Sequence, residues 1–225
     1  MNPFMAGVAR AALTTFDLPE PILEVGSYLV EGQEEVANLR KHVAGKDYVG
    51  IDYRSGPGVD SVENVEQLPR PDDSVGTVLA FNVFEHVERF WLGFEEVRRV
   101  LRPDGLLAVS CPFHFRVHNH PGDFWRFTPS ALESLLQPYP TKIIGYHGPA
   151  KRPIHVWAIA AGPDYPEITE EQSRAFQAEI QRRAPRPDSL SKQLRRRLAG
   201  VLCGRSLVAP QLESNSFHTR LLRAG

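Results

Sequence analysis

The 225-residue chain has few cysteines, no long hydrophobic run and almost no excess charge, and each shortage excludes a class of protein. Its two cysteines, Cys111 and Cys203, lie far apart without metal-ligand spacing, which excludes a disulfide scaffold and a zinc finger and favours a reducing compartment. No apolar run approaches the roughly 20 residues that a membrane-spanning helix needs. With 26 basic and 27 acidic residues the net charge is -1, so no overall attraction to nucleic acid is expected.

The amino-terminal stretch MNPFMAGVARAALTTF is apolar, but it has no basic leader and Arg10 interrupts it. We interpret it as an amphipathic helix rather than a signal peptide. These patterns together predict a soluble, cytoplasmic protein without a transmembrane segment. A composition of 42% hydrophobic and 24% charged residues is typical of one globular domain, here with an appendage.

Short apolar runs alternate with helix-like segments between about residues 22 and 160. The predicted strands are Ile22–Val25, Tyr48–Asp52, Val75–Phe81, Leu106–Cys111, Lys142–Tyr146 and His155–Ala160. The predicted helices are Glu34–Val43, Phe90–Leu101 and Pro129–Leu136. This alternation predicts an α/β fold with a doubly wound, mostly parallel sheet and helices on both faces. In such sheets ligands bind at the carboxyl ends of the strands.

The composition changes after Gly162, so the predicted division is a domain over residues 1–162 and a helical carboxyl-terminal extension over residues 163–225. The extension is expected to contain a helix near Thr169–Arg183 and a second, basic helix in LSKQLRRRLAGVL. Arg195–Arg197 would form a solvated helix face; the alternative is docking on an acidic partner or a membrane surface. A homo-oligomer or partner contact through these helices is the corresponding expectation.

The first two predicted strands end in acidic residues. The first contains Glu24 and is followed by a tight turn at Gly26-Ser27, and the second ends in Asp52 about one βαβ unit later. An acidic residue some 20 to 30 residues beyond a glycine turn is placed to accept both hydroxyls of a ribose. Asp52 is therefore the candidate ribose ligand, and Tyr53 would flank an adenine. The alternative is a structural aspartate, because many α/β proteins end a strand in this residue.

A series of motifs then follows in the segment ENVEQLPRPDDSVGTVLAFNVFEHVERFWLGFEEVRRVLRPDG. Its members are Asn64, Leu68-Pro69, Asp73-Ser74, Glu85-His86 and the turn Leu101–Gly105. In order and spacing they resemble the core of class I S-adenosylmethionine-dependent methyltransferases of the type 11 family, over roughly residues 20–160. The resemblance implies a Rossmann-like, seven-stranded sheet, a methyltransferase activity and S-adenosyl-L-methionine as cofactor.

The resemblance also implies positions for the cofactor. Glu24 and Gly26 would sit under its methionine part, with Glu24 orienting water or the ammonium group. Asn82, just beyond the strand Val75–Phe81, would face the same part. Asn64, with the backbone near Val65, would meet the adenine edge, and the aspartate at position 52 would hold the ribose. The structural alternatives are that Glu24 caps a helix and that Asn82 caps a turn.

The turn after the first strand departs from the family's glycine-rich pattern, because Tyr28 and Val30 stand where glycines are usual. Dinucleotide folds need those glycines partly for backbone approach to a pyrophosphate, which S-adenosylmethionine lacks. A subset of the family resembles E-x-G-S-x-x-x-x-G here, with Gly32 as the late glycine. We therefore expect Gly26-Ser27 to bind the cofactor, and we do not expect a nicotinamide dehydrogenase.

The loop after the predicted strand Leu106–Cys111 is rich in histidine, and HNHPGDFWRFT resembles a pattern of the same subset, H-x-x-P-x-D-[FWY]-x-R-[FWY]-T. His118 is the predicted general base, His120 the second candidate, and Asp123 the orienting partner. The alternative is a structural ion pair between Asp123 and Arg126. A metal interpretation is also available, but the spacing of the histidines fits no familiar signature.

The aromatic residues Phe124, Trp125 and Phe127 would form an apolar wall for the acceptor or belong to the core beneath the loop. Histidines suit deprotonation of a hydroxyl, so O-methylation of a small molecule, a secondary metabolite or a glycan is the leading interpretation. The alternative is a non-catalytic binding or scaffold protein that kept the fold. Nucleic-acid methylation is not expected, because NVFEH replaces an N-P-P-Y-like motif.

Overall fold

The computed structural model describes residues 1–118, 122–185 and 216–224. Its helices are α1 (Pro3–Thr15), α2 (Glu34–Ala37), α3 (Phe90–Val100), α4 (Pro129–Leu135) and α5 (Glu170–Arg183), with short 3₁₀ helices η1 (Arg40–His42) and η2 (Phe84–His86). Its strands are β1 (Ile22–Val25), β2 (Tyr48–Asp52), β3 (Ser61–Val62), β4 (Val75–Phe81), β5 (Leu101–Pro112), β6 (Thr141–His147), β7 (His155–Ala161) and β8 (Phe217–Arg223).

The strands form one sheet in the order β3-β2-β1-β4-β5-β7-β6-β8. The strands from β3 to β5 in this order pair in parallel. β7 runs antiparallel to β5 and β6, and β8 runs antiparallel to β6. Because β1 lies between β2 and β4, the carboxyl ends of these three strands meet at one edge of the sheet, where ligands of doubly wound folds bind.

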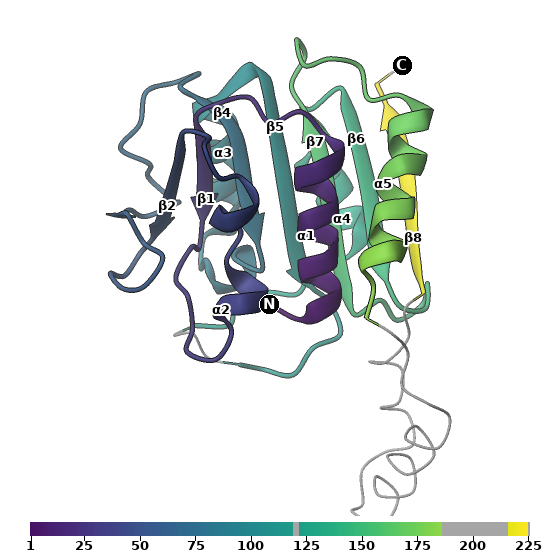
Figure 1. Ribbon diagram of the computed structural model, residues 1–225, viewed down its shortest axis with the longest axis horizontal. Coiled ribbons are helices and arrows are strands. Elements are labelled where there is room, and N and C mark those ends of the chain that lie inside the picture. The colour runs from purple at the N-terminus through teal and green to yellow at the C-terminus, as the bar shows by residue number, and fades with distance from the viewer. Residues whose placement is uncertain (119–121, 186–215, 225) are drawn as a thin grey trace, which may run out of the picture.

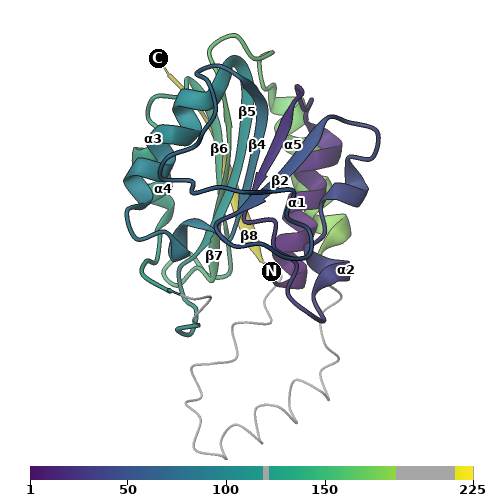
Figure 2. The ribbon, with the colours of Figure 1, turned by 90° about the vertical axis from the view of Figure 1, so that its left-hand side faces the viewer.

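Helices cover both faces of the sheet, as the two perpendicular views show (Figures 1 and 2). One apolar cluster joins buried residues of α3 and α4, such as Phe94 and Leu132, to one face. A second joins α1 and α5, through Met5, Phe16 and Phe176, to the other face. The predicted α/β, Rossmann-like class is therefore confirmed. A sheet with apolar side chains on both faces needs two such helical layers to exclude water.

The carboxyl-terminal region differs from the prediction. Among the residues that the structure describes, the sheet has eight strands rather than seven, because Phe217–Arg223 pairs with β6 as β8, so the extension is not wholly helical. The predicted basic helix and Arg195–Arg197 lie outside the described residues. The division at residue 162 stays a prediction, although α5 packs on the same core as α1.

The predicted helix Glu34–Val43 is also wrong as a single element. α2 ends at Ala37, because Asn38 takes an extended conformation, and the chain resumes as η1. Asparagine competes with helical hydrogen bonding through its own side chain, which favours such an end. The break allows Leu39 and Val43 to be buried, while α2 itself buries no residue.

The helix α5 packs against the end of α1 through a large aromatic contact. Phe176 is fully buried and meets Phe16 edge-to-face with ring centroids 5.2 Å apart. We expect Phe176→Ala to lower the free energy of unfolding by about 3–5 kcal/mol, because it removes a buried ring and leaves a cavity. Urea denaturation checks this. Arg174→Ala, an exposed position on the same helix, is the control, and a similar loss in both variants would contradict the prediction.

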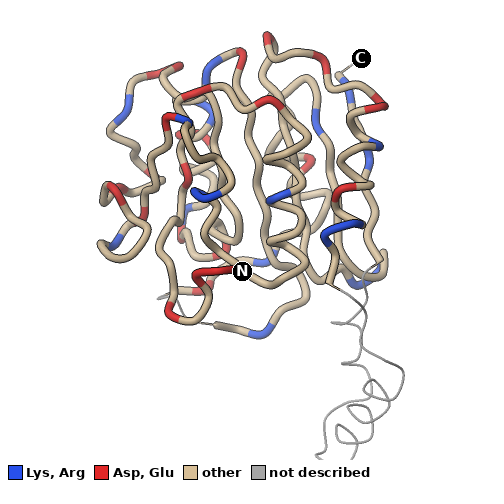
Figure 3. The backbone as a smooth tube through the Cα atoms, viewed as in Figure 1, with Lys and Arg blue, Asp and Glu red and all other residues tan. Residues whose placement is uncertain are grey.

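Basic and acidic residues are interspersed along the described backbone (Figure 3). Among the described helices, none is long and apolar enough to cross a bilayer. Cys111 is buried as a thiol within the core.

Candidate functional site

A cavity of about 770 Å³ opens at the carboxyl ends of β1, β2 and β4. This volume lies in the range of about 300–1,000 Å³ that small-molecule and cofactor sites occupy. All the residues predicted to contact a cofactor line it: Glu24, Gly26, Ser27, Asp52, Tyr53, Asn64, Val65 and Asn82. His118 lines it too, whereas Asp123 lies behind His118 and His120 lies outside the described residues.

The turn after β1 depends on Gly26. Its φ of +76° is a left-handed conformation that side chains disfavour, and a Cβ there would lie 2.6 Å from Cγ2 of Val83. The amides of Gly26 and Ser27 both donate to the carbonyl of Ile51, at 2.8 and 3.0 Å. The turn therefore connects β1 to β2 and leaves backbone, without a side chain, at the cavity wall.

Glu24 is a buried carboxylate at this wall, with 8% of its surface exposed. The hydroxyl of Tyr48 donates a hydrogen bond to its Oε2. Burial raises the pKa of Glu24 to about 7, although Tyr48 and the Arg40 charge act in the opposite direction. A cation bound in the cavity would therefore stabilise the ionised form of Glu24 and lower its pKa.

The pKa of Glu24 predicts a pH-dependent stability. Folding raises this pKa from 4.5 to about 7, so the folded chain binds the proton more tightly than the unfolded chain. The contribution of Glu24 to the free energy of unfolding is therefore present at pH 4.5 and falls by roughly 3 kcal/mol as the pH rises through 7. Urea denaturation at pH 4.5 and pH 7 measures this: the free energy of unfolding of wild type should fall by roughly 3 kcal/mol more than that of Glu24→Gln between the two pH values. Glu31→Gln, in the exposed loop, should follow wild type; parallel pH profiles for wild type and Glu24→Gln would contradict the prediction.

Asp52 lies at the end of β2 with its side chain 9% exposed and facing the same cavity. Its Oδ1 accepts the amide of Arg54 at 3.2 Å and lies 3.7 Å from Nε of that residue. Burial raises the pKa of Asp52, against the effect of these donors. The Arg54 guanidinium stacks 4.1 Å from the ring centre of Tyr28 and 5.7 Å from that of Tyr53, so these rings flank it.

Two asparagines, Asn64 and Asn82, line the cavity. Oδ1 of Asn64 accepts the amide of Glu66 at 2.9 Å, which closes a turn and leaves the amide nitrogen as its donor. Asn82 has a φ of +57°, an uncommon conformation that functional sites often contain. The backbone N–H of Asn82 donates to the backbone carbonyl of Ser110 at 2.9 Å, and the side-chain Oδ1 of Asn82 accepts from the Ser110 hydroxyl at 3.2 Å. The left-handed conformation thus turns the chain from β4 into η2 beside the cavity.

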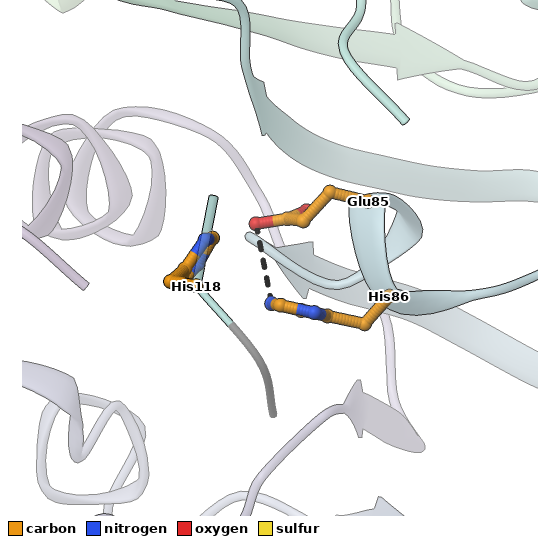
Figure 4. Close-up of side chains that lie close together, drawn as sticks. All are labelled: Glu85, His86 and His118. Atoms are coloured by element: carbon orange, nitrogen blue, oxygen red, sulfur yellow. Dashed lines mark ion pairs between the residues drawn. The ribbon is translucent and has the colours of Figure 1, made fainter. Parts of the chain in front are cut away.

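The far part of the cavity brings together Glu85, His86 and His118 (Figure 4). The first two come from η2, directly after β4, and the third from the loop after β5. Glu85 is completely buried, and burial raises its pKa to about 8. Asn82 lies close enough to lower that pKa, yet neither carboxylate oxygen meets a donor in hydrogen-bonding geometry. Nε2 of His86 is 3.8 Å from Oε1 of Glu85.

His118 is held from behind by Asp123, whose Oδ2 lies 3.0 Å from its Nδ1 and accepts its backbone amide at 2.7 Å. Arg126 grips the same carboxylate with two hydrogen bonds of 2.5 and 2.7 Å. This pairing holds the pKa of Asp123 well below its usual range. Asp123 thus contacts both His118 and Arg126, and the role of His118 as general base stays a prediction.

The three aromatic residues predicted as an acceptor wall have different positions. Phe127 belongs to the core. Phe124 lines the cavity and is half exposed. Trp125 is partly exposed outside the cavity lining, and its indole nitrogen donates to the carbonyl of Glu88 at 3.0 Å. Phe115, which was not predicted, lines the cavity with Phe124.

The pair Glu85-His86 was not predicted as part of the site, although it was recognised as a motif. The available signal was its position directly after a buried strand, since Phe81 ends β4 at the ligand-binding edge of the sheet. Arg54, two residues beyond Asp52, was missed for lack of any distinguishing pattern.

Comparison with known proteins also points to methyltransferases. A family model described as a methyltransferase domain matches residues 23–109. A probable S-adenosylmethionine-dependent methyltransferase of Mycolicibacterium smegmatis is 35% identical over 103 residues, which cover 40% of this chain and 37% of that protein. An uncharacterized methyltransferase of Mycobacterium ulcerans is 42% identical over 69 residues, covering 31% of this chain and 25% of that protein. The matched segments thus span well under half of these relatives.

The fold is also that of solved methyltransferases. The 1,6-didemethyltoxoflavin-N1-methyltransferase of Burkholderia thailandensis, solved with 1,6-didemethyltoxoflavin and S-adenosylhomocysteine, superposes with a TM-score of 0.53 at 17% identity. The match covers 72% of this chain and 79% of that one. At this level of identity the similarity concerns the fold.

Proposed function

We propose that this chain, whose residues 23–109 form a class I S-adenosylmethionine-dependent methyltransferase domain, is an enzyme that methylates a hydroxyl group of a small molecule or glycan. The observation that carries the proposal is the single cavity lined by the residues which the methyltransferase motifs assign to the cofactor. These residues come from four separate segments of the chain, and the fold gathers them at the edge where such sheets bind ligands.

The cavity fits S-adenosylmethionine chemically. Gly26 leaves open backbone where a Cβ would collide with Val83, and Asp52 presents a carboxylate for a ribose diol. Glu24 offers a buried carboxylate to an ammonium group, whose charge would lower the raised pKa of Glu24. Tyr53, Asn64 and Val65 would contact the adenine, and Asn82 the methionine part.

When bound, the cofactor supplies a methyl group on a positively charged sulfur. The chain's own residues must hold the acceptor in line with it and activate the acceptor oxygen. We assign activation to His118. Asp123 is an acceptor and keeps a hydrogen on Nδ1, so the lone pair of the neutral ring is on Nε2, where it takes up the hydroxyl proton. Phe115 and Phe124 give the acceptor an apolar surface.

The proposal is tested in two steps. Calorimetry with S-adenosylmethionine and S-adenosylhomocysteine on the folded full-length chain should give one binding site. A screen of sugars, phenols and alcohols should then reveal products heavier by one CH₂ group. Absence of binding to folded protein would overturn the enzyme assignment and favour the scaffold alternative. A cytoplasmic location, the lack of a nucleic-acid partner and any oligomer stay predictions.

A further inference from the structure

Glu85 places a carboxyl group at the cavity wall, with Nε2 of His86 as its ion-pair contact at 3.8 Å. Glu85 is completely buried, and neither Oε1 nor Oε2 meets a hydrogen-bond donor. Buried polar groups in native proteins are nearly always hydrogen-bonded or bound to metal, so a buried carboxyl group without a hydrogen bond points to a ligand. This one faces the cavity, where a cation can reach it.

The ring of His86 stands opposite this carboxylate. Its Nδ1 lies 2.5 Å from the carbonyl oxygen of Gly122, and since a carbonyl can only accept, Nδ1 carries a hydrogen. In the neutral ring the lone pair is then on Nε2, the atom 3.8 Å from Oε1 of Glu85. The backbone thus selects the tautomer in which His86 is a metal ligand.

The tautomer of His118 is also fixed by a hydrogen bond to Nδ1. Asp123, itself fixed by Arg126, accepts from Nδ1 of His118 and leaves the lone pair of the neutral ring on Nε2. Metal-binding histidines commonly donate their other ring hydrogen to a carboxylate or a backbone carbonyl, and here one histidine uses each kind of acceptor. One ligand atom from each of Glu85, His86 and His118 lies within 4.8 Å of the others (Figure 4).

We propose that Glu85, His86 and His118 bind one divalent transition-metal ion, which in turn binds the hydroxyl group of the acceptor. Two imidazoles and one carboxylate suit zinc, iron(II) or manganese, whereas magnesium and calcium prefer oxygen ligands. Ligand atoms at about 2.0–2.2 Å from an ion stand at most about 4.4 Å apart, so a small inward movement of the side chains completes the site.

The part played by the acceptor rests on the proposed function. An ion binding the hydroxyl would lower its pKa, so the O–H bond breaks and the proton passes to solvent water. The electron pair left on oxygen forms the new bond to the methyl carbon, while the bond from that carbon to sulfur breaks and its electron pair stays on sulfur. The ion uses the lone pair of His118, so it replaces this histidine as the activating group. Dependence of the activity on metal distinguishes the two assignments.

The test uses the full-length chain without a polyhistidine tag, stripped with a chelator and titrated with Co²⁺. We expect one Co²⁺ per chain with a visible absorption spectrum, displacement by Zn²⁺, and no displacement by Mg²⁺. Glu85→Gln and His86→Ala should each weaken binding at least about 100-fold, which exceeds the 10–100-fold typical of losing an outer hydrogen-bond partner. Glu88→Gln and His114→Ala are matched controls: Glu88 lines the cavity and His114 precedes the His118 loop, but neither belongs to the cluster.

Circular dichroism shows that each variant is folded, and calorimetry with S-adenosylhomocysteine is measured in parallel. Failure of Co²⁺ to bind wild type at a single site, or equal binding by wild type, Glu85→Gln and His86→Ala, would overturn the metal site. If S-adenosylhomocysteine still binds in that case, the proposed methyltransferase function stands. Co²⁺ binding that depends on Glu85 and His86 without S-adenosylhomocysteine binding would support the metal site and overturn the proposed function.

Discussion

Alanine in place of His118 is expected to lower the turnover number about 10²- to 10⁴-fold, the range that loss of a positioned proton-transfer group costs. The affinity for S-adenosylhomocysteine should stay within a few-fold of wild type, because His118 lies beside Glu85 and His86 and is not among the residues assigned to the cofactor. The measurement is the rate of S-adenosylhomocysteine formation with the acceptor identified by the mass screen.

The matched control for this variant is His114→Ala, an exposed histidine of the same loop that does not line the cavity. It should keep near wild-type turnover. Equal rates for the two variants would show that His118 neither takes a proton nor holds an ion during the reaction. Asp123→Asn should also reduce turnover, because the amide can present its NH₂ to Nδ1 and so favour the wrong tautomer of His118.

Asp52→Asn is expected to weaken the binding of S-adenosylmethionine about 10- to 100-fold. The reason is that a hydrogen bond to a charged group contributes about 1.5–3 kcal/mol, and the variant loses the charge while keeping the shape. The neighbouring Arg54 does not replace it, since a guanidinium only donates. Calorimetry with S-adenosylmethionine and S-adenosylhomocysteine measures the effect.

The control for Asp52→Asn is Asp47→Asn, which changes an exposed aspartate just before the same strand, at its opposite end. This variant should bind like wild type. Unchanged affinity in the Asp52 variant would remove the ribose role and, with it, the main support for the cofactor's orientation in the cavity.

Several elements could be predicted because their signal is local. The strands Ile22–Val25, Tyr48–Asp52 and Val75–Phe81 occur with the predicted bounds, since each is a short apolar run between turn or polar residues. The capped helix that begins after Thr128 is also present, because threonine and proline define its start locally. The resemblance to methyltransferases was likewise predicted from the order of the motifs, and a methyltransferase domain model matches residues 23–109.

Other elements could not be predicted, because their stability comes from distant partners. Phe217–Arg223 becomes a strand by pairing with β6, some 70 residues earlier in the chain. The break between α2 and η1 is selected by the burial of Leu39 in the core that α1 and α5 cover. Neither feature has a periodic pattern strong enough to reveal it.

The sequence by itself determined the fold class, the resemblance to methyltransferases and a set of positions that line the cavity, because the motifs follow strands whose carboxyl ends meet at one edge of a parallel sheet. Only the tertiary structure decided which residues lie beside His118 in the cavity. Glu85 and His86 meet His118 because β4 pairs with β5, which brings the residues after both strands together. The spacing of residues along the chain does not predict that strand pairing. The burial of Glu85 and the hydrogen bonds that orient the two histidines depend on how the loops fold, so they could not be predicted either.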